Sequence, residues 1–226
     1  MDVKTALSTR KSVRAYLKRP VERAVIEGLL DAARHAPSGA NTQPWRVWVL
    51  SGERKARLGA RLEQAFREGR RGAPDYAYYP REWFEPYQSR RRACGLQLYE
   101  ALRIARDDRQ RRADQWAANY RAFDAPVMLL FFVDRRLGAG SYLDYGMFLQ
   151  SLMLAAVEQG LATCAQAALA EYPELVRDEL GLDDELRLLC GMALGYEDRD
   201  APINAYRTPR EPVSEFTTFI DHTRRR

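Results

Sequence analysis

The sequence predicts an α+β fold in which helices cover a mostly buried sheet. Three observations support this prediction. The run PVMLLFFV at 126–133 is continuously apolar and of strand length, which is typical of a strand covered on both faces. Apolar residues recur at helical spacing at 25–33 and again at 142–159. A chain of 226 residues, 46% hydrophobic and 30% charged, has an ordinary globular composition and is long enough to bury a substantial core.

The N-terminal half is expected to hold several helices and one strand. Residues 2–9 are predicted to form a short helix with Asp2 as its N-cap. A second helix follows Pro20 and ends before PSG at 37–39. The aromatic and branched run WRVWVL at 45–50 predicts a strand. Two or three helices are then expected between 53 and 120, interrupted by APDYAYYPREWFEPY at 73–87.

The C-terminal half alternates strands and helices. After the strand at 126–133, residues 142–159 are expected to form a helix whose stripe of Tyr145, Phe148, Leu149, Leu152 and Ala156 faces the core. LATCAQ and LRLLCGMALGY predict two further strands, with a charged helix at 173–180 between them. The polar, proline-spaced tail from 199 is expected to wrap a surface.

We expect residues 1–226 to form one domain, with a helical and aromatic insertion at about 70–120 and a C-terminal extension from about 199. The most apolar stretch, 147–157, is too short for a membrane span, and the N-terminus has no apolar signal region. Three cysteines without a C-x-x-C pair fit neither a disulfide framework nor a structural zinc site. These features indicate a cytoplasmic protein without a metal site or membrane contact.

Several common function classes leave no signal in the sequence. The motifs G-x-S-x-G, G-x-x-x-x-G-K-[ST] and G-x-G-x-x-G are absent, and two histidines give little support for a metal site or a histidine base. The first 121 residues are basic, but they contain no nucleic-acid motif. The charges at 91–112 interleave with acids as on a solvated helix.

Three separated clusters share one use. Arg10, Lys11, Ser12 and Arg14 combine forked cations with a hydroxyl, as phosphate binding requires. PSGANTQPW at 37–45 offers a turn with free backbone amides and the side-chain amides of Asn41 and Gln43, which can pair with the polar edge of a heterocycle. YRTPREP at 206–212 supplies two more arginines, Arg207 and Arg210. Each cluster alone is more often an ordinary solvated surface, but together they indicate a mononucleotide-type cofactor.

The same clusters resemble the signature of the FMN-dependent nitroreductases. The N-terminal half carries R-x-S-x-R-x-[FY] at 10–16 and P-S-x-x-N-x-Q-P-W at 37–45, and the C-terminal half carries CAQAALA, CGMALGY and Arg-x-Pro at 210–212. The resemblance covers nearly the whole chain and matches least at about 70–120. That segment is similar to an insertion in the subgroup that reduces nitrobenzoate-like and other nitroaromatic compounds.

The resemblance implies a nitroreductase-like fold with a central mixed, mostly antiparallel sheet flanked by helices. It also implies an intertwined homodimer that binds two non-covalent FMN molecules at the subunit interface. Arg10 and Arg210 would hold the phosphate, Ser12 the ribityl chain, and Arg14 the pyrimidine edge. Ser38, Gly39 and Asn41 would reach the FMN of the partner subunit, the backbone of 165–167 would face N5 and O4, and Arg121 would lie at the flavin edge. The cofactor-binding residues implied are Arg10, Lys11, Ser12, Arg14, Pro37, Ser38, Gly39, Asn41, Gln43, Arg121, Ala165, Gln166, Ala167, Arg207 and Arg210.

At position 165 the sequence departs from the subgroup, which usually has proline there. Alanine makes the backbone beside flavin N5 less stiff. The closeness of the N5 contact therefore depends on how the surrounding strand is held.

The activity implied is reduction of nitroaromatic compounds by two-electron, ping-pong hydride transfer from NADPH or NADH. The flavin carries the chemistry, so no catalytic acid or base is expected. Tyr79, Trp83, Phe84 and Tyr87 are candidates for an aromatic wall against the substrate, or for packing of the insertion onto the body. Three alternatives stay open, which are reduction of quinones, enones or halogenated phenols on the same fold, flavin binding without significant turnover, and nucleic-acid binding by the basic first half. The sequence does not separate NADH from NADPH.

Overall fold

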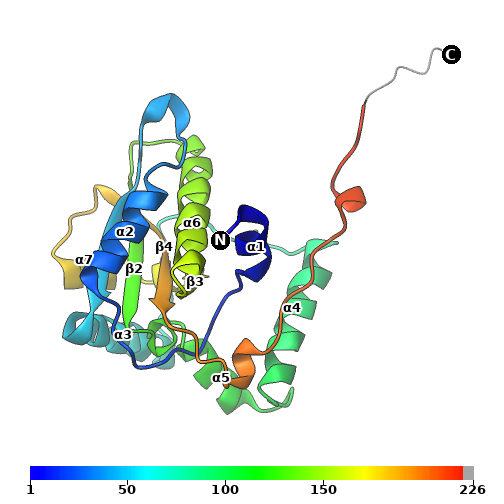
Figure 1. Cartoon of the computed structure of the whole chain (residues 1–226). Coiled ribbons are helices and arrows are strands. Elements are labelled where there is room, and N and C mark those ends of the chain that lie inside the picture. Colours follow the sequence, from blue (N-terminus) through cyan, green and yellow to red (C-terminus); the bar gives the residue numbers. More distant parts are fainter. Residues whose placement is uncertain (221–226) are drawn as a thin grey trace.

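The computed structural model describes residues 1–220 and has a four-stranded sheet between helical layers (Figure 1). The strands β1 (Arg46–Ser51), β2 (Val127–Asp134), β4 (Leu186–Gly195) and β3 (Ala162–Gln166) lie in that order, and each neighbouring pair is antiparallel. A parallel bridge joins Ser12 to Thr163 at the outer edge of β3. The predicted α+β fold with a mostly antiparallel sheet is therefore confirmed.

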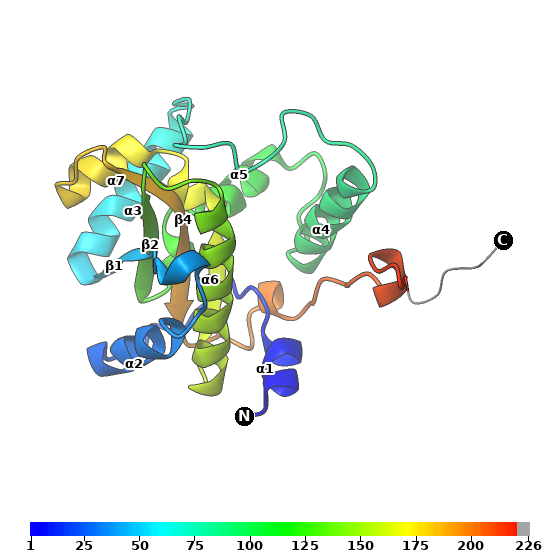
Figure 2. The same cartoon turned by 90° about the horizontal axis from the view of Figure 1, so that it is seen from above.

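The central strand β2 is buried on both faces, as its apolar run predicts. Val127, Leu129, Phe131 and Val133 pack with α2 and α6, whereas Met128, Leu130 and Phe132 pack with α3 and α7. Figure 2 shows α6 on one side of the sheet and α3 and α7 on the other. Alternate residues of a strand point to opposite faces, so this single run of eight residues supplies both halves of the core.

Seven α-helices are present within residues 1–220, and most follow the predicted ranges. The helix at 173–180 has the predicted bounds, and Asp2 caps the first helix by accepting a hydrogen bond from the Thr5 amide. The second helix ends at Ala33, before the PSG turn, and three helices occupy 53–120. None of the helices is long and apolar enough to cross a membrane. The helices are α1 (Val3–Thr9), α2 (Arg23–Ala33), α3 (Gly52–Arg67), α4 (Tyr87–Ala101), α5 (Arg109–Ala117), α6 (Gly140–Glu158) and α7 (Pro173–Leu180).

The predicted C-terminal extension behaves as two parts, and its last six residues, 221–226, lie outside the described residues. The first part, including the short helix Pro202–Asn204, packs against the segment that follows α1. The second part leaves the body and passes α4 (Figure 1), with Phe216, Phe219 and Ile220 at least 70% exposed. Residues 213–220 do not wrap the surface of their own chain, because their apolar side chains are largely exposed, and the expectation that the tail wraps a surface remains a prediction.

The predicted insertion starts from a buried anchor. Asp75 has a side chain 5% exposed and accepts hydrogen bonds from Arg135, Arg177 and the Leu188 amide, at 2.5 to 3.2 Å. Burial alone would raise the pKa of this carboxyl, but hydrogen bonds from Arg177, Leu188 and Arg135 hold the pKa below its ordinary value. The anchor fixes the start of the insertion, whereas α4 at its centre has no buried residue. The division into one domain with an insertion and an extension remains a prediction.

We expect Asp75→Ala to lower the free energy of unfolding by about 3 to 5 kcal/mol, because it leaves two guanidinium groups beside an uncompensated buried site. Urea unfolding at neutral pH measures the loss. Asp31→Ala, which removes an exposed helical pair with Arg34, is the control and should change little. Equal effects of the two variants would contradict the anchoring role.

Glu179 joins α7 to α3 and should make stability depend on pH. Its side chain is 4% exposed, and hydrogen bonds from Arg57 and Arg61 lower the pKa of Glu179 to about 2. Since the pKa is depressed in the folded state, the stabilisation is complete above the ordinary value of 4.5 and is lost as the pH falls towards 2. Unfolding curves of wild type and Glu179→Gln should therefore differ at pH 6 and converge near pH 2, and a constant difference would contradict this assignment.

Candidate functional site

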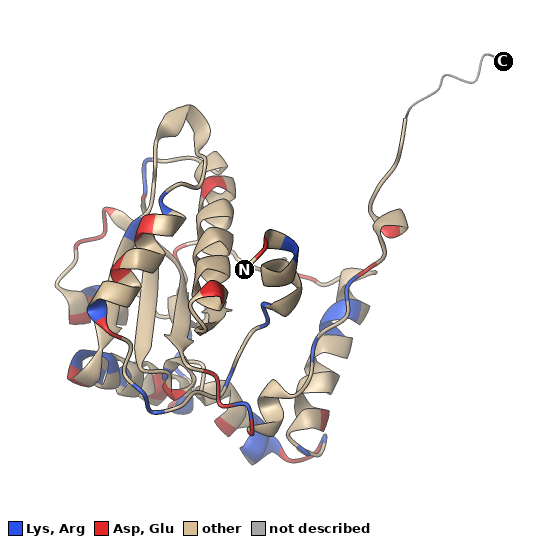
Figure 3. Ribbon diagram, viewed as in Figure 1, with Lys and Arg blue, Asp and Glu red and all other residues tan. Residues whose placement is uncertain are grey.

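A cleft of about 380 Å³ lies where the end of α1, the middle of α4 and the C-terminal segment meet. Figure 3 shows basic residues on the segment after α1 and along α4. The other lining residues are Leu7, Ser8, Cys94, Tyr206 and Thr208, so no carboxylate lines the cleft. Six residues predicted from the sequence do line it, namely Arg10, Lys11, Ser12, Arg14, Arg207 and Arg210.

Arg10 is the C-cap of α1 and is partly buried in this cleft. Burial, followed by the neighbouring guanidinium groups of Arg210 and Arg207, lowers the pKa of Arg10 from its ordinary value. Within residues 1–220 the Arg10 guanidinium has no hydrogen-bond acceptor. Cations that repel one another without a carboxylate between them are stabilised by an anionic ligand, so the cleft is suited to phosphate.

Arg207 and Arg210 differ in how much of their hydrogen-bonding capacity is already used. Arg207 donates to the backbone carbonyls of Ser8, Thr9 and Arg10, at the end of α1 where carbonyls lack helical partners. Arg210 uses only Nη1, which donates to Thr208 and to the Pro209 carbonyl. Arg207 therefore builds the cleft, whereas Arg210 keeps Nε and Nη2 available within the part of the chain described.

Lys11 faces a carboxylate of its own chain. Its Nζ lies 2.6 Å from Glu197 Oε1 and donates to the Asn204 carbonyl at 2.5 Å. Asn204 is 2% exposed, and its side chain accepts from the Arg14 amide and donates to the carbonyls of Ala15 and Asp198. Lys11 lines the cleft, but its ammonium is already paired with Glu197 and bonded to Asn204, and it therefore holds the C-terminal segment in place.

Arg14 also lines the cleft. Its guanidinium donates to the Ser12 carbonyl at 3.3 Å, contacts the Tyr206 hydroxyl at 3.5 Å, and lies 6.0 Å from the centre of the Phe123 ring. The aromatic ring and the neutral acceptors orient this cation without neutralising it. Arg14 is thus available for a ligand, as Arg10 and Arg210 are.

The strand β3 forms the sheet edge beside this cleft. The Thr163 carbonyl points outward, which here means away from the neighbouring strand β4, because it accepts a hydrogen bond from the Val13 amide at 3.0 Å. Backbone groups alternate along a strand, so the N–H of Ala165 also faces outward, and Ala165 is exposed. Gln166 points inward and donates to the Asn119 carbonyl at 2.9 Å, and Ala167 begins a short helix. A planar ligand along this edge would meet the unpaired backbone N–H of residue 165.

The loop at 37–43 does not line the cleft of its own chain. Gly39 donates to Asp144 on α6 at 3.1 Å, and the Ser38 hydroxyl accepts from the Gln43 amide at 3.0 Å. Ala40, Asn41 and Gln43 have φ near +50°, a conformation that such residues seldom adopt. The loop, including Pro37, is therefore held against α6, away from residues 10–14 of its own chain, and its implied contact with the FMN of a partner subunit remains a prediction.

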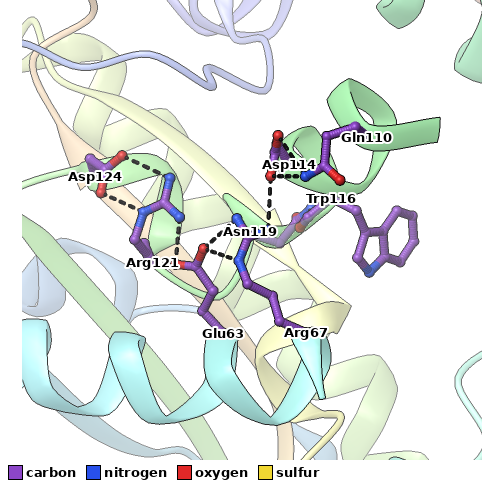
Figure 4. Close-up of polar contacts among 8 residues, drawn as sticks. All are labelled: Glu63, Arg67, Gln110, Asp114, Trp116, Asn119, Arg121 and Asp124. Carbon is purple, nitrogen blue, oxygen red and sulfur yellow. Dashed lines mark hydrogen bonds and ion pairs between the residues drawn. The ribbon is translucent and has the colours of Figure 1, made fainter. Parts of the chain in front are cut away.

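Arg121 is also outside the cleft. Figure 4 shows its guanidinium between two carboxylates, with Nη1 at 2.5 Å from Glu63 and Nε at 3.0 Å from Asp124. Arg121 lines no part of the cleft described above. Glu63 holds this side chain against α3 and Asp124 holds it to its own turn, and the implied position of Arg121 at the flavin edge remains a prediction.

The four aromatic candidates form exposed clusters on the insertion. Tyr79 packs against Trp83 with ring centres 5.5 Å apart, and Phe84 against Tyr87 at 5.2 Å. Tyr79, Phe84 and Tyr87 are about half exposed, and none of the four lines the arginine cleft. Both interpretations of these residues, substrate wall and packing of the insertion, remain predictions.

Four residues that the structure brings to this region are not predicted from the sequence, namely Cys94, Asn119, Asn204 and Tyr206. Asn204 follows Pro202-Ile203, and a polar residue beside a buried apolar one is a signal for an internal hydrogen bond. Cys94 and Asn119 carry no comparable local signal, since only the packing of α4 and of the turn before β2 places them.

The antiparallel sheet between helical layers, with a cationic cleft at the edge strand, agrees with the fold that the sequence resemblance implies. The chain belongs to the nitroreductase family, whose model matches residues 7–196.

Relatives support this assignment over nearly their whole length. A 4-nitrobenzoate reductase of Pseudomonas putida is 40% identical over 99% of this chain and 97% of its own, and a nitrobenzene nitroreductase of Ectopseudomonas oleovorans is 39% identical over 93% of each. The crystal structure of an FMN and NADPH-dependent nitroreductase, NfnB from Sphigopyxis sp. strain HMH, has a TM-score of 0.95 and 42% identity, covering 98% of this chain and 100% of that one.

The unequal states of Arg10 and Lys11 lead to a binding prediction. We expect the cofactor-free protein to bind inorganic phosphate, and Arg10→Ala to weaken binding about 10- to 100-fold, because one charge-assisted hydrogen bond is worth roughly 1.5 to 3 kcal/mol. Lys11→Met should change the dissociation constant less than about threefold, since that ammonium is already paired with Glu197. Isothermal titration calorimetry measures both constants, and equal losses would contradict the distinction.

Proposed function

We propose that this protein is an FMN-dependent oxidoreductase that uses NADPH or NADH to reduce nitroaromatic compounds. The observation that carries the proposal is the cleft in which Arg10, Arg14 and Arg210 keep free hydrogen-bond donors and face no carboxylate, beside the open backbone edge of β3. The relatives named as nitrobenzoate and nitrobenzene reductases, and the FMN and NADPH-dependent structural neighbour, support the same conclusion.

The residues present fit FMN. A phosphate monoester carries a charge of about −1.5 to −2 at neutral pH. Arg10 and the free nitrogens of Arg210 would hold it, and Arg207, already committed to the end of α1, would keep the cradle in shape. The Ser12 side chain would donate to the ribityl chain, and the outward N–H of Ala165 would bind near N5.

When bound, FMN supplies a ring atom that takes hydride from the nicotinamide and passes it to the acceptor in two-electron steps. Arg14 would lie at the pyrimidine edge, where its charge favours the more negative, reduced ring. Within the cleft no side chain has to donate or remove a proton, which agrees with a lining that lacks histidine and carboxylates. Donor and acceptor would occupy the same face in turn, so ping-pong kinetics are expected.

A homodimer would complete the site. The loop at 37–43 contributes nothing to the cleft of its own chain, and Ser38, Gly39 and Asn41 would reach the FMN of the partner subunit. The exposed apolar residues on α4 and the tail support such an assembly, among them Leu96, Phe216, Phe219 and Ile220. The three free cysteines agree with a reducing compartment, and we propose the cytoplasm.

The substrate would be a nitroaromatic ring stacked against the insertion. Tyr79, Trp83, Phe84 and Tyr87 would supply that wall from one of the two subunits. Quinones, enones and halogenated phenols remain alternative acceptors on the same site, and flavin binding without turnover remains the alternative outside catalysis.

The absorption spectrum of protein purified without added cofactor tests the proposal. We expect flavin bands close to one FMN per chain, bleached by anaerobic NADPH or NADH and restored by 4-nitrobenzoate. The double variant Arg10→Ala/Arg210→Ala should be colourless, whereas Arg23→Ala/Arg34→Ala, which removes two exposed cations at the two ends of α2, should keep its flavin.

Each alternative function predicts a different outcome of these measurements. Protein that neither contains nor binds FMN would overturn the proposal, and bound flavin that NADPH and NADH fail to bleach would leave a binding protein only. Catalytic efficiency much higher for quinones than for nitroaromatics would transfer the activity to the other acceptor class.

A further inference from the structure

We infer that Arg121 is a positioning residue, which acts on the cofactor site through a strained turn at 119–124 instead of contacting the flavin itself. The inference rests on the proposed function, because it concerns how Arg14 and the end of β3 are held beside bound FMN. Its evidence is the conformation of the turn, the contacts that hold it, and the two residues that it presents.

The 119–124 turn has an unfavourable backbone. Ala122, Phe123 and Asp124 are three successive non-glycine residues with φ of +53°, +53° and +57°. Side chains of L-residues crowd the backbone in this left-handed region, so such a run persists only where its surroundings hold it.

Arg121 ties this turn both to α3 and to itself. Nη1 donates to Glu63 on α3 at 2.5 Å, and Nε donates to Asp124 within the turn at 3.0 Å (Figure 4). The Glu63 side chain is 15% exposed, which shields this pair from water. A Cβ on Gly59 of α3 would come within 3.3 Å of the Arg121 Cα, so the turn rests directly on the helix.

The two ends of the turn contact two parts of the proposed FMN site. Phe123 is 5% exposed and lies under the Arg14 guanidinium, whose Cζ is 6.0 Å from the centre of the Phe123 ring. Asn119 accepts hydrogen bonds from the Gln166 amide group at 2.9 and 3.2 Å, next to Ala165 on the edge strand. A movement of the turn therefore displaces the cation at the ring edge and the strand beside N5 together.

Without the Arg121 guanidinium, Asp124 loses its hydrogen-bond partner, and the left-handed residues 122–124 lose their link to Glu63 on α3. The turn would open, Phe123 would no longer support Arg14, and this cation would spend less time at the ring edge. Because a nearby cation stabilises the more negative redox state, the midpoint potential of bound FMN would fall.

Arg67 provides a matched control in the same network. It pairs with Glu63 at 2.7 Å and with Asp114 on α5 at 2.8 Å, but it makes no hydrogen bond to the 119–124 turn. Arg67→Met and Arg121→Met therefore remove the same charge and one contact to the same carboxylate. Only Arg121→Met removes the hydrogen bonds that join position 121 of the 119–124 turn to Asp124 and to α3.

The experiment compares both variants in two measurements. In FMN-free protein, hydrogen exchange of the amides at 119–124 should be at least tenfold faster in Arg121→Met. With FMN bound, reduction should become about tenfold less favourable, which for a two-electron couple is about 30 mV towards negative potential. Arg67→Met should stay within about twofold of wild type in both.

Equal exchange rates of the turn amides or equal midpoint potentials of FMN in the two variants would overturn the inference. Arg121 would then only form an ordinary ion pair with Glu63. Should Arg121→Met fail to fold, Arg121→Lys replaces it, because one ammonium cannot bridge Glu63 and Asp124 as a planar fork does, and shifts in the same directions are expected. Wild-type protein without affinity for FMN would overturn the proposed function and this inference with it, and is recognised before any variant is compared.

Discussion

The cleft depends on one set of hydrogen bonds, which joins the segment after α1 to the segment at 204–207. Arg207 donates to three carbonyls at the end of α1, and Asn204 bonds the backbone of residues 14 and 15. Both segments are irregular, so their backbone groups would otherwise need water. The hydrogen bonds that satisfy these backbone groups also set the spacing of the arginines. The binding surface therefore results from the same contacts that stabilise the two irregular segments.

Within this framework, cations of the same kind do different work. Lys11 and Arg207 are matched with acceptors of the chain and hold it together, whereas Arg10 remains partly buried beside other guanidinium groups. A site made only of unpaired cations would destabilise the fold through repulsion, and one made only of paired cations would not bind. The division between paired and unpaired charges lets the protein fold before its ligand arrives.

Much of this architecture could be predicted from local patterns. The apolar run of β2 and the charged helix α7 are predicted with nearly their observed bounds, and residues 10–14 and 207–210 do meet in one cleft. The pairing of Lys11 with Glu197, the burial of Asn204 and the carboxylates around Arg121 could not be predicted, because each depends on a partner brought close only by the fold. The exposure of residues 213–220 could not be predicted either, since polarity and prolines indicate an irregular segment but not what it covers.

The distance along the chain between the two sides of the cleft has a consequence for biosynthesis. The Arg207 contacts span 197 to 199 residues, so the N-terminal side of the cleft cannot be completed until residue 207 has emerged from the ribosome. The sheet can form earlier, because β1 to β4 all lie before residue 196. A chain that ended before residue 204 would thus keep all four strands but lack one side of the cleft, because Tyr206, Arg207, Thr208 and Arg210 would be missing.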